Sequence, residues 1–159
     1  SSPETAKIGL DHLFHDMYFA GPVRAHANSQ AQLTSPVWLY HFNHVPPTGM
    51  GQLFGSHHAA EVGYVFGTLT TQDQASDGEL NPENGNFTDA DMHLSETIRA
   101  YWIQFAATGN PNREGLQDWP VFTPATDTHL ELNTTISTGT SLHATGSQLW
   151  HNFELSLRD

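Results

Sequence analysis

Cysteine is absent from the 159 residues, so disulfide bonds and thiolate metal sites are excluded. Lysine and arginine together number only 5, against 17 aspartates and glutamates. The resulting formal charge of -12 repels phosphate backbones and anionic lipid surfaces. We therefore expect no nucleic acid among the partners of this protein.

Long hydrophobic runs and glycine-rich phosphate loops are missing as well. The apolar stretches at residues 37–40 and 62–69 are much shorter than the roughly 20 residues that cross a bilayer, so we expect no membrane partner. Glycines never stand side by side, and neither the Walker pattern nor the dinucleotide-binding pattern occurs. Nucleotide chemistry and a cofactor are therefore not expected, and the cellular compartment is left open.

The residues that are present predict a folded globular piece with at least one buried strand. Residues 37–42 are β-branched and aromatic, as in a strand covered on both faces, and residues 129–132 predict a second short strand. The proline- and glycine-rich stretch 43–56 predicts a loop that delivers His57 and His58 to its end. The polar residues 70–86 show no periodicity and predict a surface excursion.

Helical spacing of apolar residues is found on both sides of these strands. A helix is expected to begin at Ser2-Pro3 and to be interrupted at Gly21-Pro22, with a short second helix over residues 24–32. Thr88 to Asp91 match a capping box, and the stripe after them predicts a helix that stops at Gly109. In a final helix the residues that share a face would be Leu149, Trp150, Phe153 and Leu157. Helices around a buried strand favour an α/β fold.

Eleven histidines raise the hypothesis of a metal site, with three pairs as candidates: His12 with His15, His41 with His44, and His57 with His58. The segment His58-Ala59-Ala60-Glu61 lacks the second histidine of the zinc pattern, because Val62 stands in that place. No metal is therefore predicted. A metal-binding or small-molecule-binding domain built from these histidines stays as an alternative.

Residues 55–67 read Gly-Ser-His-His-Ala-Ala-Glu-Val-Gly-Tyr-Val-Phe-Gly and resemble the histidine segment of the type-B carboxylesterase and cholinesterase family. Downstream, residues 91–112 and Trp119-Pro120 are similar to the helix and turn that follow in that family. Upstream, residues 16–24 and 37–42 are similar to the preceding helix and strand. The resemblance implies that this chain is the C-terminal portion of an α/β-hydrolase fold, with few strands and several helices.

The resemblance also implies roles for two residues. His58 would be the catalytic general base, and Glu61 a supporting residue behind it or a charge at a helix N-terminus. His57 falls out of register and is interpreted as a polar loop residue. We expect the aromatic residues on the helical stripes to pack in the core rather than to line an acyl pocket: Tyr64, Phe66, Trp102 and Phe105.

The serine nucleophile that this chemistry needs is not found, since no serine has glycine two residues before and two residues after it. We expect residues 1–159 to be the C-terminal part of a single catalytic domain whose N-terminal part carries the nucleophile and the acid. Joined to that part, the chain would hydrolyse small-molecule carboxylic esters as a serine esterase through an acyl-enzyme, and alone it would be inactive. A non-catalytic binding or adhesion-type relative of the same fold, or an inactive fragment, is the alternative.

Overall fold

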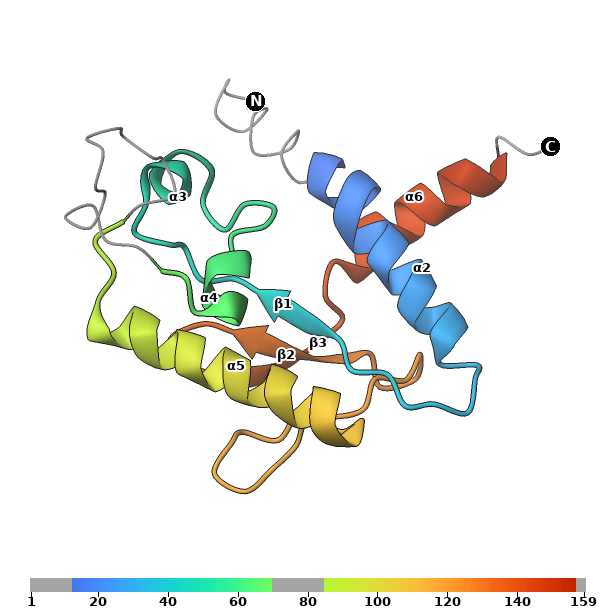
Figure 1. The fold of residues 1–159 in the computed structure, drawn as a ribbon. Helices are drawn as coiled ribbons and strands as arrows, with labels where there is room; N and C mark the ends of the chain where they lie inside the picture. Colours follow the sequence, from blue (N-terminus) through green and yellow to red (C-terminus); the bar gives the residue numbers. More distant parts are fainter. Residues whose placement is uncertain (1–12, 70–84, 157–159) are drawn as a thin grey trace. The chain divides into compact units, whose positions relative to one another are not determined.

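The computed structural model describes residues 13–69 and 85–156, which divide into two compact units. The first, called here the helical unit, comprises Ser1–Leu39, Pro120–His129 and Gly139–Asp159. The second, called here the sheet unit, comprises Tyr40–Trp119 and Leu130–Thr138. Figure 1 shows their elements along the chain. The predicted helix start at Ser2-Pro3, most of the predicted surface excursion and Leu157 lie outside the described residues.

The helical unit contains the π-helical turn η1 (Asp16–Ala20), α2 (Gly21–Gln30) and α6 (Ala144–Ser156), which pack against one another. The predicted interruption at Gly21-Pro22 is wrong, because the chain stays helical through both residues. The Gly21 N–H bonds to the Asp16 carbonyl oxygen five residues back, and Pro22 follows in the first turn of α2. A π-turn widens the helix where proline lacks an N–H, so the helix passes through it.

A small apolar cluster and an ion pair stabilise the helical unit. Ala27, Leu39 and Phe122 are buried together. The Arg24 guanidinium donates to both carboxylate oxygens of Asp127 at 2.7 and 2.6 Å and to the Leu142 carbonyl oxygen at 2.9 Å. Several large apolar side chains of this unit stay exposed: Leu13, Phe14, Tyr18, Phe19, Val23 and Leu149.

Within residues 13–69 and 85–156, three strands form one sheet in the order β1 (Tyr40–Phe42), β2 (Thr128–Leu132) and β3 (Ser137–Thr140). Strands β1 and β2 run parallel, with Tyr40 opposite Leu130 and Phe42 opposite Leu132. The predicted strand at residues 129–132 is confirmed, whereas only the last three residues of the predicted strand 37–42 join the sheet. Strand β3 was not predicted, since its sequence Ser-Thr-Gly-Thr shows no apolar alternation.

The predicted loop 43–56 contains a helix, α3 (Gly49–Phe54), which corrects the sequence interpretation. The Thr48 side chain caps it by accepting a hydrogen bond from the Gly51 N–H. A Cβ atom at Gly51 would overlap the Pro46 carbonyl oxygen, so the tight path from Pro46 into α3 requires glycine there. Glycine is a poor helix former, and composition alone therefore indicated a loop.

Helices α4 (Val62–Phe66) and α5 (Asp89–Thr108) pack against each other in the sheet unit (Figure 1). The capping box of Thr88 and Asp91 is confirmed, and α5 ends at Gly109 in the left-handed conformation, as predicted. Tyr64 is buried as expected, but Phe66 is 71% exposed and Phe105 is exposed too, so these two do not pack in this core. Among the described residues, no helix has the length and apolarity to cross a membrane.

Candidate functional site

His58 lies in the turn that joins α3 to α4, and its side chain is exposed. Two unusual backbone conformations shape this turn. Gly55, which ends α3, has a φ of 69°, and Ala59, directly after His58, has a φ of 66°. For a residue with a Cβ such as Ala59, the left-handed region costs about 1–2 kcal/mol. The surrounding contacts must therefore hold the turn in this shape.

The side chains of the two residues before His58 fix the turn through hydrogen bonds to main-chain carbonyl oxygens. The Ser56 hydroxyl donates to the Phe42 carbonyl oxygen at 2.7 Å and ties the turn to the end of β1. The half-buried His57 ring turns back, with Nδ1 2.9 Å from the His58 carbonyl oxygen, and Ala60 is buried. The exposed His58 imidazole is thus attached to a main chain that is held in place. The His57 ring contributes to holding it, because it bonds to the His58 carbonyl oxygen.

Glu61 occupies the N-cap position of α4, three residues after His58, but its side chain makes no capping hydrogen bond. The Tyr40 hydroxyl lies 3.5 Å from its Oε1. Burial, and then the charge of Glu61 and this hydrogen bond, raise the pKa of Tyr40 to about 12. Tyr40 therefore stays a neutral donor toward the Glu61 carboxylate throughout the neutral range.

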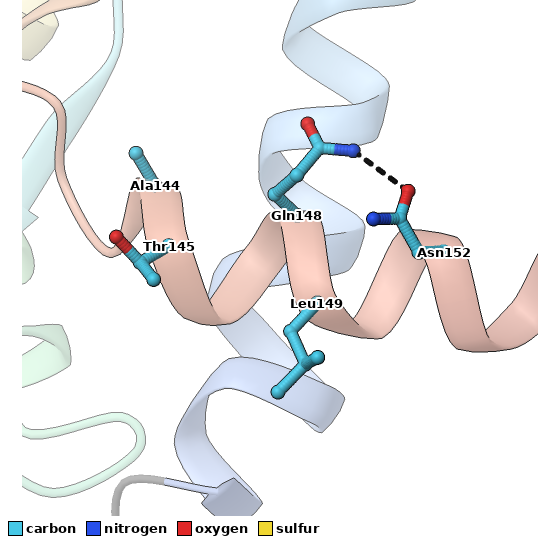
Figure 2. Close-up of a pocket in the computed structure, with 5 residues that line it drawn as sticks. All are labelled: Ala144, Thr145, Gln148, Leu149 and Asn152. Atoms are coloured by element: carbon cyan, nitrogen blue, oxygen red, sulfur yellow. Dashed lines mark hydrogen bonds between the residues drawn. The ribbon is translucent and has the colours of Figure 1, made fainter.

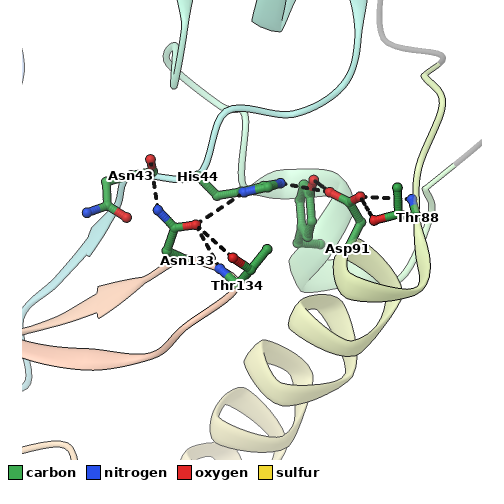
Figure 3. Close-up of polar contacts among 7 residues, drawn as sticks. Asn43, His44, Thr88, Asp91, Asn133 and Thr134 are labelled. Carbon is green, nitrogen blue, oxygen red and sulfur yellow. Dashed lines mark hydrogen bonds and ion pairs between the residues drawn. The ribbon is translucent and has the colours of Figure 1, made fainter.

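A buried carboxylate, Asp91, connects four segments of the sheet unit (Figure 3). Its Oδ1 accepts the Tyr64 hydroxyl of α4 at 2.8 Å and lies 2.7 Å from Nε2 of His44, which follows β1. Its Oδ2 accepts the N–H and the hydroxyl of Thr88 at 2.8 and 2.7 Å. The other ring nitrogen of His44 points to Asn133 after β2, at 3.4 Å. We call Asp91, Tyr64, His44 and Thr88 the Asp91 network.

The Asp91 network keeps its carboxylate ionised. Burial by itself would raise the pKa of Asp91, but the Thr88 N–H and hydroxyl, followed by Tyr64 and His44, lower the pKa below its ordinary value. For Tyr64 the same contact acts in the other direction, since burial and then Asp91 raise the pKa of the phenol. At neutral pH a negative charge that is only 3% exposed is thus held by hydrogen-bond donors.

The sequence predicts His58 and Glu61 as candidate site residues, but it does not indicate the Asp91 network. The sequence predicts Asp91 as part of a helix cap, Tyr64 as core packing, and His44 as one of the metal candidates. The available signal is the position of His44 two residues after a predicted buried strand, where functional loops often begin.

The predicted histidine pairs are not brought together as pairs. His41 lies 3.0 Å from the Glu131 carboxylate across β1 and β2, whereas His44 contacts Asp91. In the helical unit the His15 ring packs against the His143 ring, with centroids 4.5 Å apart. His12 lies outside the described residues.

A shallow hollow lies along α6 in the helical unit (Figure 2). Its lining consists of Ala144, Thr145, Gln148, Leu149 and Asn152, and the Gln148 amide donates to Asn152 at 3.0 Å. None of these five side chains is ionisable. The hollow therefore offers neither an acid nor a base, and the turn at His58 is the better candidate for chemistry.

Comparisons with known proteins give one consistent result. The family model described as the carboxylesterase family matches residues 1–150. A para-nitrobenzyl esterase of Bacillus subtilis is 34% identical over 127 residues, which cover 79% of this chain and 24% of that protein. A cocaine esterase of Homo sapiens is 30% identical over 155 residues, 93% of this chain and 25% of that protein. The chain thus spans about a quarter of the length of these curated relatives.

Solved structures agree with the sequence matches. A structure titled PNB esterase superposes with a TM-score of 0.65 at 31% identity, covering 86% of this chain and 26% of the other. A thermophilic PNB esterase gives a TM-score of 0.68 at 28% identity, with the same coverage. The expected fold class is confirmed: the chain has the architecture of part of an α/β-hydrolase, with few strands and several helices.

Proposed function

Because this chain belongs to the carboxylesterase family, we propose that it supplies the catalytic histidine, His58, of a serine-dependent carboxylic ester hydrolase. The observation that carries the proposal is the anchored turn, in which Ser56 holds the main chain while the His58 ring stays exposed. A general base needs an imidazole that is both accessible and fixed in orientation. The turn at residues 55–61 supplies the accessible imidazole and an anchored main chain, and the acid in the rest of the protein would fix the orientation of the ring.

In the complete protein His58 would move one proton in each half of the reaction. It takes the proton of a serine hydroxyl while the serine oxygen bonds to the ester carbonyl carbon, and it gives that proton to the departing alcohol as the ester C–O bond breaks. It then takes a proton from water, whose oxygen attacks the acyl-enzyme, and returns the proton to the serine. The serine, the acid that orients His58 and the oxyanion donors belong to the rest of that protein.

We propose that Glu61 supports this turn rather than serving as the acid of the triad. Its carboxylate faces the hydroxyl of the half-buried Tyr40, and it stands at the start of α4, where negative charge is favourable. Residues 1–159 are proposed to be the C-terminal part of one catalytic domain. The relatives, of which the matched part of this chain covers about a quarter, support this assignment.

The first experiment combines the intact mass of the purified material with a short-chain aryl ester assay, with and without a serine-directed organophosphate. We expect the 159-residue chain alone to turn over no ester, and the complete protein to lose its activity to the inhibitor. Turnover by the chain alone would contradict the proposal. A complete protein that neither hydrolyses esters nor reacts with the organophosphate would favour the non-catalytic relative.

His58→Gln in the complete protein tests the residue itself. We expect kcat to fall by about a thousandfold or more, the scale seen when a triad histidine is removed. The matched control is His57→Gln, which removes the neighbouring imidazole and keeps a side-chain donor for the His58 carbonyl oxygen. It should retain activity within about fivefold, because a triad uses one imidazole. Equal losses in both variants would remove the assignment of His58.

A further inference from the structure

We propose that Asp91 is a positioning residue for His58, acting through Tyr64 on α4 and resting on the function proposed above. Asp91 lies on α5 and is 33 positions from His58 along the chain. It reaches the turn because the Tyr64 hydroxyl bonds to its Oδ1 and because α4 starts directly after the turn. A second bond joins the same two helices, since the Ser95 hydroxyl of α5 donates to the Tyr64 carbonyl oxygen at 2.8 Å.

The other end of the turn depends on the same carboxylate. His44 lies 2.7 Å from Asp91 and directly follows the segment Phe42-Asn43. Phe42 supplies the carbonyl oxygen that accepts the Ser56 hydroxyl. The two anchors of the His58 turn, one before it and one after it, therefore lead to one buried carboxylate oxygen.

This arrangement is more than the helix cap that a capping box requires. The cap uses Oδ2, which accepts both donors of Thr88. Oδ1 is not needed for the cap, and it is the atom that contacts α4 and the chain after β1. Tyr64 is 1% exposed and its ring packs on Phe42 and His44, so the hydroxyl has a fixed direction. Oδ2 therefore stabilises the start of α5, whereas Oδ1 makes the contacts that would position the His58 turn.

The test compares Tyr64→Phe with the matched control Tyr101→Phe. Both tyrosines are buried in the sheet unit, and each variant removes one hydroxyl and keeps the ring. The Tyr101 hydroxyl donates to the Gln117 carbonyl oxygen at 2.6 Å and makes no bond to the Asp91 network. Both variants should lower Tm, but only Tyr64→Phe removes a link to the His58 turn.

The first readout is the nuclear magnetic resonance spectrum of the 159-residue chain, with labelled alanine methyls and histidine rings. We expect the Ala59 methyl and the His58 ring signals to shift or broaden in Tyr64→Phe and to stay unchanged in Tyr101→Phe. The Ala59 signal is informative because its φ of 66° is sensitive to the shape of the turn. Identical spectra around residues 58–60 in the two variants would overturn the proposal.

The second readout is the kinetics of the complete esterase. We expect Tyr64→Phe to lower kcat about tenfold with KM changed less than about twofold, since misplacing a catalytic group affects the transition state more than binding. Tyr101→Phe should leave both constants within about twofold. A loss shared equally by the two variants would reduce Asp91 to a structural residue. If His58→Gln keeps full activity, the proposed function fails, while the spectra still decide the positioning role.

Discussion

The two units of the protein stabilise themselves by different means. The sheet unit buries large side chains, including Tyr64, Ile98 and Tyr101, and encloses a charged carboxylate among donors. The helical unit buries a smaller cluster of Ala27, Leu39 and Phe122. Both units leave large apolar side chains in solvent, such as Leu149 at 68% and Phe66 at 71% exposed. The two units therefore differ in what they bury, large rings and a charge against a small apolar cluster, rather than in how much apolar surface they expose.

The charged contacts of the two units differ in the same way. Asp91 is 3% exposed and accepts hydrogen bonds on both oxygens from three residues. Asp127 also has both oxygens engaged, but by a single residue, Arg24, and both side chains are 15% exposed. We therefore expect substitutions in the sheet unit to cause larger and more global effects than those in the helical unit.

The largest effect is expected from Ile98→Ala, with Leu149→Ala as its matched control in the helical unit. Ile98 is completely buried, so removing its side chain should lower the free energy of unfolding by about 2–5 kcal/mol. Leu149→Ala should change it by less than about 0.5 kcal/mol, because its side chain is already in solvent. Urea unfolding followed by circular dichroism measures both. Similar losses of unfolding free energy in Ile98→Ala and Leu149→Ala would contradict the proposed difference between the two units.

A smaller and more local effect is expected from Arg24→Gln. The change removes two charge-assisted hydrogen bonds to Asp127 and one to the Leu142 carbonyl oxygen, with an expected cost of about 1.5–3 kcal/mol. Hydrogen exchange should localise the lost protection to α2 and α6, while α5 keeps its protection. Arg113→Gln is the control, since Arg113 is exposed and its loss should be nearly neutral. Equal loss of protection in α5 would show that the two units unfold together.

The sequence carries the local part of this structure well. The capping box predicts the start of α5, and Gly109 predicts its end. The β-branched and aromatic run predicts the position of β1. These features are readable because each depends on residues within a few positions of one another. The π-turn at Gly21 and helix α3 were missed because local composition there argues against a helix and other contacts override it.

The site is readable only in part for a related reason. The turn of His58 is a contiguous segment, so a family resemblance could indicate it. In the Asp91 network, Tyr64 and His44 are 27 and 47 positions away from Asp91, and no short-range sequence pattern predicts contacts over such separations. The fold must first place α4, α5 and the end of β1 side by side. The capping box in the sequence predicts the role of Asp91 as a helix cap. The contacts of its Oδ1 with Tyr64 and His44 can be identified only in the structure.

The smallest effect on the free energy of unfolding is expected when the hydroxyl of one tyrosine is removed from each unit. Tyr101→Phe removes a buried hydrogen bond and should cost about 0.5–1.5 kcal/mol at neutral pH, whereas Tyr18→Phe, at a ring that is 57% exposed, should cost less than that. Burial, and then the charge of Asp118, raise the pKa of Tyr101 to about 12. The folded state therefore keeps this proton after the unfolded chain has begun to lose it, near pH 10.

The sign of the pH effect follows from that order. The stability that Tyr101 contributes is fully present below about pH 10 and is lost as pH rises toward 12, because proton release then favours the unfolded state. The difference in unfolding free energy between the parent protein and Tyr101→Phe should accordingly stay constant up to about pH 10 and narrow between about pH 10 and pH 12. Urea titrations at several pH values measure it. A difference that stays constant across this range would mean that Tyr101 is not held as a neutral phenol by the sheet unit.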